Sequence, residues 1–356
     1  MERPHAVVAD ELGQVISGHH STAGRRAIVN RVSKVRQGYD WGDRSARWAG
    51  VISEFVDVGA VRAHYLRIDA MDRGSADALP HLLIHPMGAG SWSWMDVIRP
   101  LSAYGRVIVP DLPGAGRTRP SDRQAGSGPA GARFLVDFTQ ALGLGPVVVH
   151  GHSMGALVGA LFADLAPEGV ARLVLAAPAL PGRPDPPRFP GLWRLALASA
   201  PTLARIPMRA GIRMKAGLWR RWRDDPHDPR LVRAMRAMGT DLSLVSPELL
   251  DLITEEIGRY RLSWRIDGAL NAAVSVLSTL TVDQEAVRQA LDRISAPTLL
   301  LWGTADRLIR SALIDDLVTE HPDWAFHPVD GIGHGLPWEA PETYVGVVGP
   351  WATGSA

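Results

Sequence analysis

The residues best placed to do chemistry lie in the pentapeptide GHSMG, residues 151–155, which satisfies the pattern G-x-S-x-G. The apolar run VVVH at 147–150 precedes it, and an Ala-rich segment with helical spacing follows it. A serine between two glycines at a strand-to-helix turn points its hydroxyl away from the backbone, because glycine lets the chain reverse without Cβ clashes. Ser153 is therefore a candidate nucleophile, and it needs a base and an acid to activate it.

Two later segments supply that base and that acid. Asp306 stands in the stretch GTAD, just after the apolar run at 297–303, and His334 stands in GIGHG, after the run at 324–330. The carboxyl ends of parallel strands meet at one edge of a sheet, so Ser153, Asp306 and His334 can converge there. In this hypothesis Ser153 attacks, His334 moves the proton, and Asp306 orients the imidazole and stabilises its cation.

Acyl chemistry also needs N–H donors for the developing oxyanion. The backbone N–H of Met154 is one candidate, and the second is that of Met87 in the loop HPMGAG, because Pro86 has no N–H. We expect His85 to brace this loop. We expect Asp111, in DLPGAGRT, to stabilise its own turn, and GAGRT is not a phosphate loop because the P-loop Lys is absent.

Short apolar runs and helix-like segments alternate along the part of the chain that must position these residues. The runs at 81–85, 106–110, 146–150, 172–178, 297–303 and 324–330 are typical of buried strands. The segments 93–102, 131–142, 156–165 and 310–320 are typical of helices. The alternation predicts the α/β class, with a mostly parallel, doubly wound sheet, and residues 54–69 predict an antiparallel hairpin around Gly59 at its edge.

The alternation of apolar runs and helix-like segments, and the places where it stops, divide the chain into three parts. Residues 1–51 are predicted to be an N-terminal accessory extension, residues 52–181 and 272–356 the α/β core, and residues 182–271 a helical cap inserted over the sheet. The cap is rich in Trp, Met and Arg. Its candidates for an apolar substrate pocket are Trp193, Trp219, Trp222, Trp264 and Met208. The Arg-rich stretch 205–223 favours a solvated helix face, and a basic rim for an anionic substrate is the alternative.

Composition limits the classes of partner. The 38 basic and 37 acidic residues leave a net charge of +1, so no global field favours nucleic acid, and there is no Cys for a disulfide or a thiolate zinc site. His150 and His152 lack a third metal ligand at suitable spacing. No secretory signal and no membrane-spanning run is apparent. We expect a cytoplasmic enzyme that takes a small molecule and needs no metal or cofactor, whereas the oligomeric state stays open.

The quoted motifs GHSMG, DLPGAGRT, GTADRLI and GIGHGLPWEAPE resemble those of the α/β-hydrolase fold superfamily, in its serine esterase, lipase and carbon–carbon hydrolase branches with a helical cap. The resemblance covers residues 52–181 and 272–352 and implies that fold. Pro86 departs from the glycine usual in the family at that position. Haloalkane dehalogenases and epoxide hydrolases are also similar, but they carry Asp as the nucleophile, and Ser153 argues against them.

Three functions remain open. The first is a serine hydrolase that cleaves a carboxylic ester or related acyl bond of a bulky, largely apolar molecule through an acyl-enzyme. The second uses the same triad for acyl transfer, carbon–carbon bond hydrolysis or acyl-group elimination in a natural-product pathway, because such outcomes depend on water access and pocket shape. The third is a ligand-binding module without catalysis, which would not need a working triad.

Overall fold

The computed structural model describes residues 39–71, 77–120, 126–182, 195–197, 225, 228–237, 239–259 and 263–354. Nine strands form one sheet in the order β1-β2-β3-β5-β4-β6-β7-β8-β9. They are β1 (Tyr39–Asp40), β2 (Ile52–Val58), β3 (Val61–Ile68), β4 (His81–Ile84), β5 (Val107–Pro110), β6 (Val147–His152), β7 (Val170–Ala176), β8 (Thr298–Gly303) and β9 (Ala325–Val329). From β5 to β9 all neighbours run parallel, and β1, β2 and β3 add an antiparallel edge. The predicted mostly parallel sheet and the edge hairpin are confirmed.

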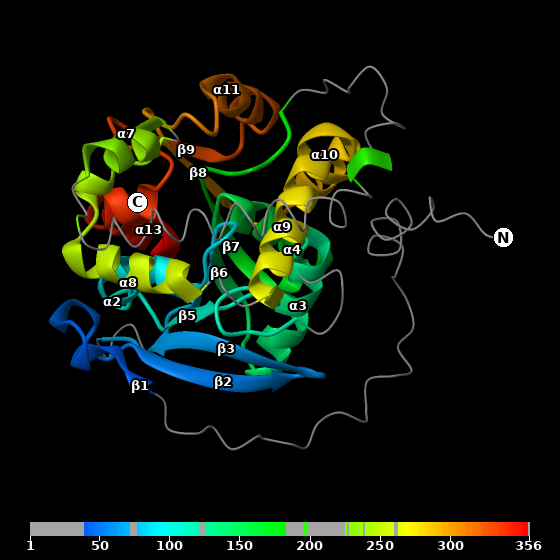
Figure 1. Ribbon diagram of the computed structural model, residues 1–356. Helices are drawn as coiled ribbons and strands as arrows, with labels where there is room; N and C mark the ends of the chain where they lie inside the picture. Colours follow the sequence, from blue (N-terminus) through cyan, green and yellow to red (C-terminus); the bar gives the residue numbers. More distant parts are fainter. Residues whose placement is uncertain are drawn as a thin grey trace.

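Helices cover both faces of this sheet (Figure 1). They are α2 (Met95–Leu101), α3 (Gly128–Ala141), α4 (Met154–Leu165), α7 (Pro229–Ala237), α8 (Pro247–Gly258), α9 (Ser263–Thr281), α10 (Gln284–Asp292), α11 (Ser311–Glu320), α12 (Leu336–Glu339) and α13 (Pro341–Thr353). Helices α3, α4 and α10 pack on one face, and α2 and α13 pack on the other. Successive side chains of β6 point to opposite faces of the sheet. Val147 and Val149 belong to the apolar cluster that includes α3, α4 and α10, and Val148 belongs to the cluster that includes α2 and α13.

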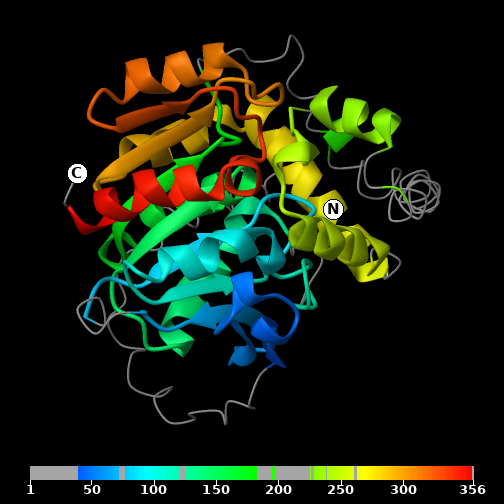
Figure 2. The ribbon, with the colours of Figure 1, turned by 90° about the vertical axis from the view of Figure 1, so that its left-hand side faces the viewer.

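The part of the chain between β7 and β8 contributes helices to one flank of the sheet (Figure 2). Within residues 182–271 the described elements are α7, the 3₁₀ helix η6 (Leu242–Leu244), α8, the start of α9 and residues 195–197. Helix α9 runs across the predicted boundary after residue 271. None of the helices in the described ranges is long and apolar enough to cross a membrane.

Residues 39–51 pack against the core rather than standing apart from it. Trp41 and Trp48 are buried in the same apolar cluster as α2. The Nε1–H of Trp48 donates to a carboxylate oxygen of Asp96 at 2.8 Å, and the other oxygen of Asp96 accepts from the Ser246 hydroxyl, at the start of α8, at 2.6 Å. One buried carboxylate thus joins this segment, α2 and α8.

Candidate active site

The turn from β6 into α4 holds Ser153 in a backbone conformation that side chains rarely adopt. Its φ is 55° and its ψ is −116°, one of two positive φ values among the described non-glycine residues. Only glycine fits at positions 151 and 155. A Cβ at Gly151 would lie 2.4 Å from the carbonyl oxygen of Gly155, and a Cβ at Gly155 would lie 2.2 Å from the carbonyl oxygen of Ile84. Local strain is common where a site must present one side chain, and here that side chain is a hydroxyl.

The structure brings together the three side chains that the sequence singled out. The Oγ of Ser153 lies 3.1 Å from Nε2 of His334, and Nδ1 of His334 lies 2.9 Å from Oδ2 of Asp306. With Nδ1–H donating to the carboxylate, Nε2 is left to accept the proton of the hydroxyl. The arrangement can therefore activate an alcohol by general base catalysis.

Asp306 is itself held in place by the turn after β8. Its Oδ1 accepts the backbone N–H groups of Leu308 at 2.8 Å and Ile309 at 3.0 Å. Its side chain is fully buried, and Oδ2 faces the imidazole of His334. Because Oδ1 is held by two backbone N–H groups, the carboxylate cannot rotate freely. Oδ2 therefore points toward His334 and orients its ring.

The backbone of His334 is held by hydrogen bonds at both its N–H group and its carbonyl oxygen. The backbone N–H of His334 donates to the carbonyl oxygen of Gly239, and its carbonyl oxygen accepts from Nε2 of His152 at 2.7 Å. Burial, and then the proximity of His334, lower the pKa of His152 to about 3, so His152 is neutral and its proton lies on Nε2. His152 is therefore a positioning group for the backbone of the proposed base.

Glu339 was not anticipated as a site residue, and it holds the same loop. Its Oε2 accepts the N–H of Gly333 at 3.0 Å and its Oε1 accepts that of Gly335 at 2.9 Å, so the carboxylate brackets His334. Burial raises the pKa of Glu339, and backbone N–H groups, including that of Asp241, oppose the shift. The residue lies in the quoted motif GIGHGLPWEAPE, but its partners are backbone groups, which residue types do not reveal.

The two predicted oxyanion donors are the backbone N–H groups of Met87, in the loop after β4, and of Met154, at the start of α4. Met154 is the first residue of α4, where N–H groups have no partner within the helix, and neither its amide nor that of Met87 bonds to another residue of the described chain. In the Met87 loop, Nδ1 of His85 donates to the carbonyl oxygen of Pro86 at 2.9 Å. Its Nε2 accepts the N–H of Leu112 at 3.1 Å, so the expected bracing by His85 is confirmed.

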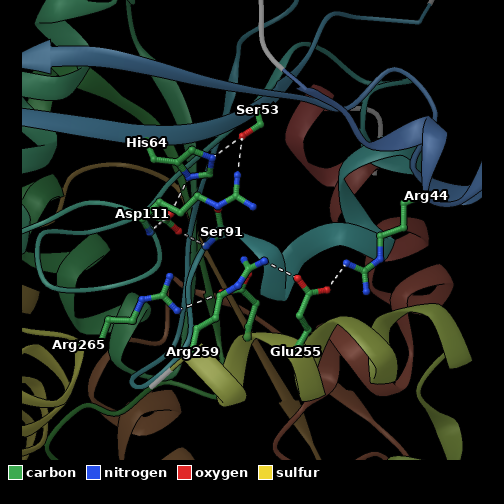
Figure 3. A network of polar contacts seen from close by, with 10 residues as sticks. Arg44, Ser53, His64, Ser91, Asp111, Glu255, Arg259 and Arg265 are labelled. Carbon is green, nitrogen blue, oxygen red and sulfur yellow. Dashed lines mark hydrogen bonds and ion pairs between the residues drawn. The ribbon is translucent and has the colours of Figure 1, made fainter. Parts of the chain in front are cut away.

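Asp111 joins this loop to the edge of the sheet (Figure 3). Its carboxylate accepts the N–H groups of Ser91 at 2.6 Å and Arg117 at 2.7 Å, and it pairs with Nδ1 of His64 at 2.6 Å. Burial alone would raise the pKa of Asp111, but His64 and the hydrogen bonds outweigh it and the pKa falls below its ordinary value. The role expected for Asp111, stabilising its turn, is what these contacts provide.

The predicted substrate contacts are only partly visible. Trp193, Trp219, Trp222 and Met208 lie outside the described residues, as does the whole Arg-rich stretch 205–223. Trp264 is described in α9, where the guanidinium of Arg265 lies 5.4 Å from its ring centroid. Arg265 also forms a buried ion pair with Glu256 at 3.1 Å. Figure 3 shows Arg265 near Arg259, which pairs with Glu255. Trp264 thus contacts a charged network at the junction of α8 and α9.

His150 and His152 each have their own hydrogen-bond partners within the fold. Nε2 of His150 lies 2.9 Å from Nδ1 of His81, and its Nδ1 lies 2.9 Å from the hydroxyl of Tyr344. Burial lowers the pKa of His81 to about 4 and the pKa of His150 well below its ordinary value. Across the described ranges, no group of three His, Asp or Glu side chains could hold a metal ion.

Known proteins agree with this architecture. A family model described as the alpha/beta hydrolase fold matches residues 80–341. The 2-hydroxy-6-oxo-6-phenylhexa-2,4-dienoate hydrolase of Burkholderia cepacia is 26% identical over 296 residues, which are 82% of this chain and 93% of that protein. A haloalkane dehalogenase of Mycolicibacterium paratuberculosis is 34% identical over 158 residues, 43% of this chain and 52% of that protein.

A solved structure, that of a serine hydrolase involved in carbazole degradation, superimposes with a TM-score of 0.60 at 21% identity, covering 84% of this chain and 97% of that one. At that identity the likeness concerns the fold. The family match spans most of the chain and includes all three residues that meet at the edge of the sheet. The chain belongs to the alpha/beta hydrolase fold family.

Proposed function

We propose that this hydrolase cleaves a carboxylic ester or related acyl bond of a bulky, largely apolar small molecule through an acyl-enzyme. One observation carries the proposal: the chain of contacts from Ser153 Oγ to His334 Nε2 at 3.1 Å and from His334 Nδ1 to Asp306 Oδ2 at 2.9 Å. It is the arrangement that nucleophilic catalysis by a serine requires. The positive φ of Ser153 supports the same role.

In the proposed reaction, Nε2 of His334 takes the proton of Ser153 as Oγ attacks the carbonyl carbon. The N–H groups of Met154 and Met87 stabilise the oxyanion, and its collapse expels the alcohol, which takes the proton from His334. Water then attacks the acyl-enzyme, His334 accepts its proton, and the acid leaves as Oγ regains a proton. Asp306 stabilises the imidazolium in both steps.

The test uses p-nitrophenyl butanoate in stopped flow. The wild-type enzyme should release a burst of about one p-nitrophenolate per molecule, and Ser153→Ala should abolish that burst. Ser311, exposed at the start of α11, provides a matched control, and Ser311→Ala should keep the burst. A full burst from folded Ser153→Ala protein would refute the acyl-enzyme. Failure of a fluorophosphonate probe to label Ser153 in the wild type would favour the non-catalytic alternative.

Hydrolysis of a carbon–carbon bond is the second candidate, because the Burkholderia relatives are named as hydrolases of 2-hydroxy-6-oxo acids. The experiment offers the phenyl dienoate named for the first relative in ¹⁸O-labelled water. Carbon–carbon hydrolysis gives labelled benzoate and 2-hydroxypenta-2,4-dienoate. Unchanged dienoate, with turnover of the ester, supports the first proposal. In the same labelled water, acyl transfer would give a new ester in place of a free acid, and elimination would give an acid without label.

A further inference from the structure

A cavity of about 400 Å³ lies between one face of α7 and the loop after β8, outside the set of residues assigned to the reaction. Its lining residues are Pro229, Val232, Arg233, Arg236, Ala237 and Arg307. The volume is within the range of pockets that hold small organic molecules. Half of the lining is apolar and half is guanidinium, so the cavity suits a molecule with two unlike ends.

The guanidinium groups outnumber their acidic partners. Arg236 pairs with Asp241, whose Oδ2 lies 3.0 Å from its Nε and 2.9 Å from its NH2 group. Arg233 and Arg307 are exposed, and neither pairs with a carboxylate of the described chain. Arginine binds carboxylate and phosphate oxygens through paired N–H donors, and here two such side chains on separate elements face one cavity.

We propose that this cavity binds a small molecule with an oxyanion head and an apolar body. Arg233 and Arg307 bind the head, and Val232, Ala237 and Pro229 contact the body. A carboxylate and a phosphate share the required chemistry, and the apolar half of the lining favours an apolar carboxylic acid. That is the class of molecule that hydrolysis of an apolar acyl substrate releases, a link that rests on the proposed function.

The cavity adjoins the loops that carry the proposed acid and base. Arg307 follows Asp306 directly, and Gly239, just beyond α7, accepts the N–H of His334. Gly239 has a φ of +82°, and a Cβ there would lie 2.6 Å from the backbone nitrogen of Arg307. The segment after α7 is thus in backbone contact with both loops, and it tolerates no side chain at this position.

The test measures binding by calorimetry on protein whose Ser153 has been blocked with a fluorophosphonate, so that the acyl site is filled. The probes are octanoate, octanol as its neutral analogue, and inorganic phosphate. Octanoate should bind at least about tenfold more tightly than octanol, and added salt should weaken it. If phosphate displaces octanoate at similar concentrations, the apolar body contributes nothing to binding and the proposal of an apolar carboxylate is overturned; if it does not, the site selects an apolar carboxylate as proposed.

The variant Arg233→Gln/Arg307→Gln should raise the Kd of octanoate by about tenfold or more. Arg230 is exposed on the same helix but does not line the cavity, so Arg230→Gln is the matched control and should leave the Kd unchanged. If the double variant does not fold, Arg233→Gln alone should raise the Kd. Equal binding of octanoate and octanol, or a Kd unaffected by these changes, would overturn the proposal.

Failure of the proposed function gives a different result. If the fluorophosphonate does not label Ser153, the serine is not an activated nucleophile, and the octanoate titration is then performed on untreated protein. The dependence of that binding on Arg233 and Arg307 still decides whether the cavity is an anion site. The two proposals therefore succeed or fail separately.

Discussion

Replacing Glu339 by Gln tests whether the peptide groups around His334 set the alignment of its ring. The carboxylate accepts two backbone N–H groups, those of Gly333 at 3.0 Å and Gly335 at 2.9 Å, and the residue is 6% exposed. An amide offers one oxygen and one NH2 group, so one of the two N–H groups would face another donor. A hydrogen bond to an ionised group contributes about 1.5–3 kcal/mol, and a buried donor left unpaired costs about 1–3 kcal/mol.

If misalignment of His334 raises the activation free energy by about 2 kcal/mol, kcat falls about thirtyfold. KM should change by less than about threefold, because Glu339 is proposed to act on the base and not on the substrate. The assay is ester turnover together with the rate of fluorophosphonate labelling of Ser153, which reports nucleophile activation directly.

The matched control is Glu342→Gln, three residues further along. The side chain of Glu342 is 78% exposed, and its nearest cation is Arg47 at 3.7 Å, so this change should leave kcat unaltered. Thermal unfolding separates alignment from stability: a folded Glu339→Gln protein is required for the comparison. If such a protein turns over ester as fast as Glu342→Gln does, the carboxylate does not position His334 and the reasoning is wrong.

Three further outcomes are expected. Gly155→Ala should prevent stable folding, or lower the free energy of unfolding by about 3 kcal/mol or more, because its Cβ would lie 2.2 Å from the carbonyl oxygen of Ile84; urea titration measures this. Burial lowers the pKa of His81 to about 4, and below the ordinary value of about 6.5 the unfolded chain binds protons that folded His81 and His150 do not. The free energy of unfolding should therefore fall as the pH drops from about 6.5 to 4, by about 3 kcal/mol for His81 alone, and a constant value in urea titrations across that interval would contradict the argument. Asp111→Asn should destabilise the protein by about 3 kcal/mol or more in the same assay, because it leaves a buried imidazole and two short N–H bonds without a carboxylate.

Much of the sheet could be predicted because each central strand is a short apolar run that ends in Gly, Pro or a polar residue. The run at 146–150 became β6, Val147–His152, which is buried throughout. The run at 324–330 became β9, Ala325–Val329, but the expectation of a buried strand was wrong there, because β9 is the edge strand of the sheet and Val329 is its only buried residue. The two-residue strand β1 has too little sequence for any periodicity, and it exists because Tyr39 pairs with Ser53. The predicted helix at 93–102 is divided, since Ser91–Trp94 form a 3₁₀ turn before α2 begins at Met95.

The three side chains of the candidate site could be identified because their types and their order after strands carry the information. Their supports could not. Glu339 and His152 act on the backbone of the His334 loop, and Gly239 contributes a carbonyl oxygen from a distant segment. A sequence displays side-chain chemistry, whereas these contacts depend on where peptide groups come together after folding. The cavity beside Arg307 was hidden for the same reason, because its two halves are far apart in the chain.

The way Asp96 joins Trp48 to Ser246 has a practical consequence for anyone who shortens this protein. A chain trimmed to begin with β2 would look complete by motif, yet it would strip one partner from a buried carboxylate and remove Arg44, which pairs with Glu255 of α8 at 2.7 Å. Affinity tags and fusion partners are therefore better joined ahead of residue 39 than at the start of the hairpin.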